Sequence, residues 1–115
     1  MDDVVARLRE ICLSLPEAEE KPFGGHSAPS FRIRDKLFAM MPEDGAELWV
    51  KGAPGAQEEM IASAPEVYYR PPYVGPKGWI GVRLQAGPDW TELAELIEDS
   101  YRLIAPKRLA ARLDD

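Results

Sequence analysis

Residues 71–81, PPYVGPKGWIG, constrain the fold of this chain more than any other segment. Three prolines and three glycines among these residues exclude a helix, and the apolar run 80–84 follows directly. This order predicts a tight, rigid turn that leads into a strand. The segment presents Tyr73, Lys77 and Trp79 but no acidic side chain, which is typical of a loop that displays a binding site. The sequence favours, over such a display, a purely structural hairpin between the last two strands in which Tyr73 and Trp79 pack at the sheet edge.

Length and composition indicate a single domain over residues 1–115. The chain is 45% hydrophobic, which suffices for one core without disulfides or metals. The single cysteine, Cys12, cannot form an internal disulfide, which fits a reducing compartment. The acidic start Met1-Asp2-Asp3 is unlike a targeting peptide, and the apolar runs are too short to span a membrane. We therefore expect a soluble cytoplasmic protein.

The charges are segregated along the chain. The net charge is −6 and the isoelectric point about 4.8, which argues against non-specific binding of nucleic acid. Residues 21–42 nevertheless contain four basic side chains and one acidic one, and residues 67–88 contain three basic side chains and no acidic one. These two basic segments coincide with predicted strands, whereas most acidic residues lie in predicted helices and turns.

Apolar residues at helical spacing predict three helices, over residues 3–14, 54–64 and 90–104. Pro16 follows the first helix and Pro54 lies near the start of the second. Asp89 and Glu92 form a start similar to a capping box for the third helix. The predicted buried face of that helix consists of Trp90, Leu93, Ala94, Ile97, Tyr101 and Ile104. Residues 107–115 are expected to add a short helical tail or to fray.

Five strands are predicted, over residues 31–34, 37–41, 47–51, 67–70 and 79–84. A short turn at Asp35-Lys36 joins the first two strands. Residues 17–21 are open to either a strand or a loop, and residues 22–26 form a connection. Short connections favour antiparallel pairing. The predicted fold is an α+β two-layer sandwich of order α-β(3)-α-β(2)-α, in which helices cover one face of a mostly antiparallel five-stranded sheet.

Four stretches together resemble the YjbR/MmcQ family of small bacterial proteins. They are LPEAEE (15–20), FRIRDKLFAM (31–40), PYVGPKGW (72–79) and SYRLIAPK (100–107). The resemblance implies a secretion-chaperone-like or frataxin-like α+β fold. Members are commonly labelled DNA-binding on the basis of their fold, which by itself does not establish that function. The resemblance brings no residue set with an agreed catalytic or binding role.

The strand alternation separates a core face from a second face rich in aromatic and basic side chains. Ile33, Leu37, Ala39, Leu48, Val50, Ile80, Val82 and Leu84 fit the core face. Together with the turn at residues 71–79, the second face gives a candidate binding patch. The candidate residues are Arg32, Arg34, Phe38, Trp49, Lys51, Tyr73, Lys77, Trp79 and Arg83. Such a face can form a homodimer or protein-partner interface, bind nucleic acid, or be covered internally, and a one-residue slip would exchange the faces.

No catalytic constellation is recognisable in the sequence. His26 is the sole histidine and is expected to be structural, as is Cys12 on the apolar face of the first helix. Glu17, Glu19 and Glu20 are expected to be solvated; iron binding, which frataxin-like proteins perform with acidic helices, is the weaker alternative. We therefore expect a non-enzymatic interaction module without a cofactor or metal. The alternative is a nucleic-acid-binding protein that uses the basic-aromatic sheet face.

Overall fold

The protein folds as helices packed on one face of an antiparallel sheet. The computed structural model describes residues 3–22, 29–42 and 47–114. The helices are α1 (Asp3–Leu13), α2 (Ala56–Ser63), α3 (Trp90–Ile104) and α4 (Lys107–Ala111). The strands are β1 (Glu19–Pro22), β2 (Pro29–Ile33), β3 (Lys36–Met40), β4 (Glu47–Val50), β5 (Tyr68–Tyr69) and β6 (Ile80–Arg83). Short 3-10 turns are η1 (Gly75–Lys77), η2 (Leu84–Ala86) and η3 (Arg112–Asp114).

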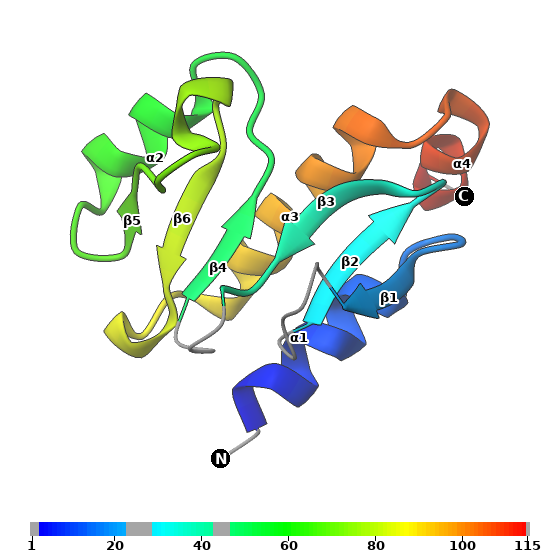
Figure 1. Ribbon diagram of the computed structural model, residues 1–115, viewed down its shortest axis with the longest axis horizontal. Helices are drawn as coiled ribbons and strands as arrows, with labels where there is room; N and C mark the ends of the chain where they lie inside the picture. The colour runs from blue at the N-terminus through cyan, green and yellow to red at the C-terminus, as the bar shows by residue number, and fades with distance from the viewer. Residues whose placement is uncertain (1–2, 23–28, 43–46, 115) are drawn as a thin grey trace.

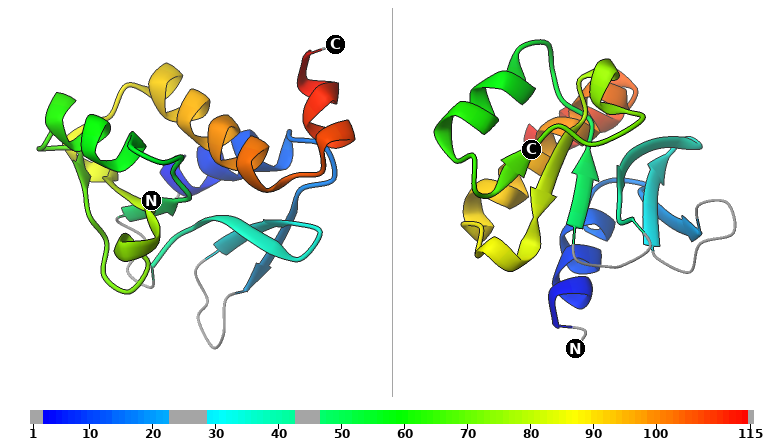
Figure 2. Two further views of the ribbon diagram at one scale, coloured as in Figure 1. Left: turned by 90° about the horizontal axis from the view of Figure 1, so that it is seen from above. Right: turned by 60° about the vertical axis from the view of Figure 1, so that its left-hand side comes forward.

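The α+β class predicted from the sequence is confirmed, with six strands instead of five. All neighbouring strands are antiparallel in the order β1-β2-β3-β4-β6-β5 (Figure 1). The additional strand is β1, which lies within the stretch that the sequence left open between a strand and a loop. The left view of Figure 2 shows the helices on one side of the sheet. Among the described residues, no α-helix covers the opposite face, and no helix is long and apolar enough to cross a membrane.

The β2–β3 hairpin turns one residue earlier than predicted. Arg34 and Asp35 have positive φ angles of 53° and 65° and occupy the two central positions of the turn. Paired left-handed residues match the twist of antiparallel strands and give the tightest hairpins. Arg34 therefore belongs to the turn, and its predicted place on the second strand face was wrong.

A bulge in β3 reverses the predicted orientation of Phe38. Phe31 pairs with Ala39 whereas the next residue, Arg32, pairs with Leu37, so Phe38 is an extra residue on β3. An extra residue interrupts the alternation of side chains along a strand. Phe38 is fully buried and its ring meets that of Tyr101 edge-on, with centroids 5.7 Å apart. Phe38 is thus a core residue, and its predicted place on the second face was wrong.

The core lies between the sheet and helices α1 and α3. Leu48, Val50, Ile80 and Val82 are fully buried, as their predicted alternation requires. Of the predicted buried face of α3, Leu93, Ile97 and Tyr101 are fully buried, and Trp90, Ala94 and Ile104 are partly buried.

Two polar contacts fix the position of α3. Asp89 caps the helix as predicted, since its carboxylate accepts hydrogen bonds from the backbone N–H groups of Thr91 and Glu92 at 2.9 and 3.3 Å. The Tyr101 hydroxyl donates to the Pro16 carbonyl at 2.6 Å and so ties α3 to the segment after α1.

Candidate functional site

The loop between β5 and β6, residues 70–79, is held in one conformation and is called the display loop below. Gly75 N–H donates to the Pro71 carbonyl at 3.0 Å, and Gly78 N–H to the Gly75 carbonyl at 2.9 Å. Gln57 of α2, only 5% exposed, donates its amide to the carbonyls of Gly75 and Trp79 at 3.0 and 2.6 Å. A buried amide with two loop carbonyls as partners anchors the loop from behind.

Tyr73 projects from the display loop into solvent. Its side chain is 88% exposed, and its φ angle is 63°. A bulky residue in the left-handed region is strained, and such strain persists where the surrounding structure over-determines the backbone. Val74 N–H, hydrogen-bonded to the Pro72 carbonyl at 2.6 Å, helps to hold this conformation. The loop therefore presents one exposed aromatic side chain on a hydrogen-bonded backbone.

Two cations accompany Tyr73. Arg70 lies across Gly75 so closely that a Cβ at Gly75 would come 2.7 Å from Arg70 Cγ. Lys77 is exposed in η1. Within the described parts of the chain, neither cation forms an ion pair. The display loop thus contains one exposed aromatic ring and two cations without an ion pair among the described residues.

Trp79 closes the display loop and was predicted to lie on the solvated face. The structure corrects this, because Trp79 is only 6% exposed. Its backbone N–H bonds to the Val74 carbonyl at 3.4 Å, and its carbonyl accepts from Gln57. The loop folds back onto its own last residue, so Trp79 is a packing residue.

A polar-aromatic cluster lies on the sheet face away from the helices. This Tyr69 cluster consists of Glu47, Trp49, Tyr69, Gly81 and Arg83. Trp49 Nε1 donates to the Tyr69 hydroxyl at 2.8 Å, and that hydroxyl donates to Glu47. The Arg83 guanidinium stacks on the Tyr69 ring, 4.5 Å from its centroid. Burial and the hydrogen bond to Glu47 raise the pKa of Tyr69 above its ordinary value of 10.0.

The predicted patch is therefore divided. Trp49 and Arg83 meet through Tyr69, and Tyr73 and Lys77 share the display loop. Arg34 instead pairs with Glu17, with 3.1 Å between Nη2 and Oε1. Lys51 lies elsewhere, in a pocket beside α3.

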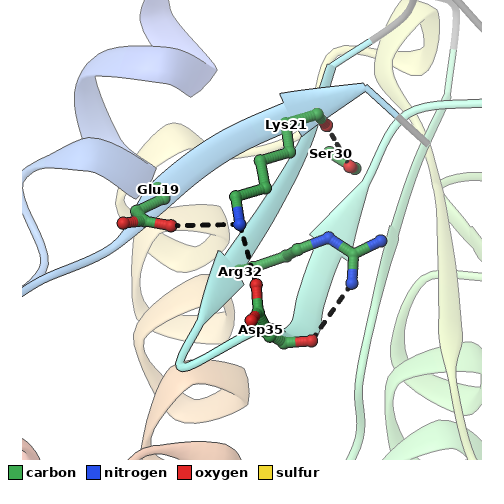
Figure 3. A network of polar contacts seen from close by, with 5 residues as sticks. All are labelled: Glu19, Lys21, Ser30, Arg32 and Asp35. Atoms are coloured by element: carbon green, nitrogen blue, oxygen red, sulfur yellow. Dashed lines mark hydrogen bonds and ion pairs between the residues drawn. The ribbon is translucent and has the colours of Figure 1, made fainter.

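Arg32 belongs to a separate network at the β1 end of the sheet (Figure 3). Its guanidinium donates to the Asp35 backbone carbonyl at 3.1 Å. Lys21 lies 2.7 Å from Asp35 Oδ1 and 3.5 Å from a Glu19 oxygen, and Ser30 donates to the Lys21 carbonyl. The hydrogen bond between Lys21 and Asp35 raises the pKa of Lys21 and lowers the pKa of Asp35. Arg32 and Lys21 therefore form contacts within the β1–β2–β3 edge of the sheet.

Sequence reasoning missed Gln57, Tyr69 and Arg70. A glutamine in an otherwise ordinary helix gives no local signal that its amide reaches a loop 18 residues away. Tyr69 could have been found from its position in a predicted strand within the basic segment 67–88, but its partners depend on strand order.

The predicted structural residues have different outcomes. Cys12 is fully buried, and burial together with the charge of Glu20 raises its pKa to about 12. His26 lies outside the described residues. Across residues 3–22, 29–42 and 47–114, no three His, Cys, Asp or Glu side chains converge to hold a metal ion.

The fold defines the class of protein as a two-layer α+β sandwich with an antiparallel sheet. The YjbR family model matches residues 13–103. The protein belongs to the YjbR family, as the sequence resemblance predicted. A similar solved structure is the crystal structure of Deinococcus radiodurans protein DR2400, with a DUF419 domain. It is 23% identical, covers 96% of this chain and 87% of that one, and superposes with a TM-score of 0.80. No curated protein matches the chain significantly.

Proposed function

We propose that this protein is a non-enzymatic interaction module that binds an acidic protein surface through its display loop. The observation behind the proposal is the exposure of Tyr73, 88%, on a loop with a fixed and strained backbone. A loop that is ordered before binding loses little conformational entropy on association, so its contacts contribute more fully to affinity. Tyrosine and arginine are also the side chains that most often dominate interface energetics.

The charge of the loop supports an acidic partner. Arg70 and Lys77 flank Tyr73, and residues 67–88 contain no acidic side chain. Opposite charges on the two partners accelerate encounter and fix the register of an interface. The remainder of the chain is acidic, with an overall net charge of −6, so the loop is a local positive site on a negative protein.

Nucleic acid is the alternative partner, because an exposed ring beside two cations can also stack a base and approach phosphates. Ion pairs neutralise several of the basic residues behind this alternative. Arg34 pairs with Glu17, and Lys21 pairs with Glu19 and Asp35. Five basic side chains of the two basic segments have no ion pair among the described residues, and two of them, Arg70 and Lys77, lie in the display loop. The net charge of −6 opposes binding of a polyanion such as nucleic acid, which favours the protein partner.

Fluorescence polarisation with two labelled peptides tests the proposal. One peptide contains glutamates around an aromatic residue, and the other replaces each glutamate by lysine. We expect saturable binding of the acidic peptide only, weakened about tenfold or more by Tyr73→Ala and abolished by Lys77→Glu. Lys36→Glu changes an exposed lysine at the β2–β3 turn and serves as the matched control.

Two results would overturn the proposal. The first is equal binding of both peptides, or of neither. The second is binding of DNA with a steep loss of affinity between two salt concentrations, which would identify nucleic acid as the ligand. Sedimentation velocity tests whether the protein forms a homodimer. Self-association that is lost in the Tyr73→Ala variant would identify a second copy of the chain as the acidic partner.

The non-enzymatic part of the proposal has its own support and test. Cys12 is buried with a pKa of about 12, so its thiol is a poor nucleophile at neutral pH. A panel of hydrolase and transferase substrates checks for turnover. Robust turnover that disappears in the His26→Ala variant would make the protein an enzyme.

A further inference from the structure

A second site is formed by a pocket between the end of β4 and helices α2 and α3. Its volume is about 290 Å³. Small-molecule sites occupy roughly 300–1,000 Å³, so this pocket suits a ligand of few heavy atoms. The apolar part of its lining consists of Ala53, Ala56, Leu96 and Leu103. Leu103 is 44% exposed and is one of only three large apolar side chains so exposed among the described residues.

The pocket is built on fixed elements. Ser100 is fully buried, and its hydroxyl shares one proton between the Lys51 carbonyl at 2.6 Å and the Leu96 carbonyl at 3.0 Å, so it joins the end of β4 to α3. Gly52 packs against the display-loop backbone, where a Cβ would come 2.5 Å from the Gly78 carbonyl oxygen. These contacts hold the lining in place before any ligand arrives, which lowers the cost of binding.

The charged side chains in the lining define the ligand chemistry. The Arg102 guanidinium forms ion pairs with Glu98, at 3.3 Å between Nε and Oε2, and with Asp114, at 2.9 Å between Nη2 and Oδ1. Lys51 and Asp99 also line the pocket, and neither forms an ion pair within the part of the chain that the structure describes. One ammonium and one carboxylate beside apolar walls are complementary to a ligand that has both charges and an apolar body.

We propose that this pocket binds a small zwitterion with an apolar body, such as a free aliphatic amino acid. The ligand carboxylate meets Lys51, its ammonium meets Asp99, and its aliphatic part packs on Leu96 and Leu103. Neither charge alone satisfies both protein groups, so a simple carboxylate or a simple amine binds more weakly. This site is independent of the proposed function of the display loop.

An NMR titration of the ¹⁵N-labelled protein tests the site with four probes. L-Leucine has both charges and an aliphatic body, 4-methylpentanoate lacks the ammonium, 3-methylbutylamine lacks the carboxylate, and glycine lacks the body. We expect leucine to shift the amides of residues 51–53 and 96–103, with a dissociation constant on the order of 1 mM for a ligand of this size. The other three probes should bind at least about threefold more weakly, since each loses one set of contacts.

Variants assign the roles of the charged groups. Lys51→Met keeps an unbranched side chain of similar length and removes its charge, and Asp99→Asn keeps the shape of the carboxylate. Each should weaken leucine binding about threefold or more, whereas Lys77→Met in the display loop should leave it unchanged. Thermal melts show whether each variant is folded. The proposal is overturned if leucine gives no saturable shifts at these amides up to about 20 mM, if 4-methylpentanoate or the amine binds as well as leucine, or if both charge variants bind like the wild type.

Discussion

Trp49 and Tyr69 are hydrogen-bonded across an intervening strand, with 2.8 Å between the indole nitrogen and the hydroxyl. The residue between them is Gly81, which pairs with Trp49 on one side and Tyr69 on the other. The Tyr69 ring occupies the space that a side chain at position 81 would fill, since a Cβ there would come 2.4 Å from the ring. The contact therefore requires a residue without a side chain in the middle strand.

Gly81→Ala should displace the Tyr69 ring and break its bond to Trp49. We expect a loss of about 1–3 kcal/mol in the free energy of unfolding, the usual cost of overpacking. Urea denaturation measures it. The same substitution in a Tyr69→Leu background should cost less, because the obstructing ring is gone. Equal costs in the two backgrounds would show that the ring does not set the requirement for glycine.

Phe38→Ala should destabilise the protein by about 3–5 kcal/mol, the range for a buried aromatic residue. The reason is the bulge in β3, which turns Phe38 toward Tyr101 in the core. Leu37→Ala, at the partly buried neighbouring position, is the matched control and should cost roughly half as much or less. The denaturant midpoints of the two variants are compared. A larger loss of stability in Leu37→Ala would mean that Leu37, and not Phe38, lies in the core, as the strand alternation predicted.

Tyr73→Gly should separate binding from stability. Glycine adopts the left-handed backbone at no steric cost, so it relieves the strain at a φ angle of 63°. Because glycine also loses more entropy on folding, we expect the free energy of unfolding to change by less than about 1 kcal/mol. Peptide binding, in contrast, should be lost. A variant that unfolds readily would show that Tyr73 has a structural role.

The thiol of Cys12 should react only when the protein unfolds. Its pKa is raised to about 12 in the fold, against an ordinary value of 9.0. The labelling rate with a thiol reagent should therefore follow the unfolded fraction across a urea series. An acid whose pKa is raised by folding also lowers stability as the pH rises above its unfolded value. Cys12→Ala should reduce that loss of stability above pH 9.0; rapid labelling of the native protein would contradict the assignment.

Acid should weaken the contact between Lys21 and Asp35. The hydrogen bond from Lys21 lowers the pKa of Asp35 below its ordinary value of 3.8. A carboxyl group with a lowered pKa stabilises the fold above its unfolded pKa, and this contribution is lost as the pH falls through the folded value. The wild type should thus lose more stability than Asp35→Asn between neutral pH and pH values below 3.8. Asparagine tolerates the left-handed backbone of the turn, so identical pH slopes would mean that the ion pair is without effect.

The sequence by itself determined the features that depend on neighbours along the chain. Asp89 caps α3 because its carboxylate reaches the N–H groups two and three residues ahead. Leu48 and Val50, or Ile80 and Val82, share the core face because alternate side chains of a regular strand point the same way. The rigid turn at residues 71–79 follows from its prolines and glycines, and Tyr73 and Lys77 were found there for that reason.

The tertiary structure decided everything that depends on pairing between distant segments. Phe38 is in the core because it is an extra residue on β3 between the pairs Phe31–Ala39 and Arg32–Leu37. No local sequence pattern predicts this bulge. Trp49 meets Tyr69 because β4 and β5 both pair with β6, whose Gly81 has no side chain and leaves room for the Tyr69 ring. Arg34 pairs with Glu17 instead of joining a surface patch because the hairpin turns one residue early. Register and strand order arise from contacts between segments far apart in sequence, so local sequence patterns do not determine them.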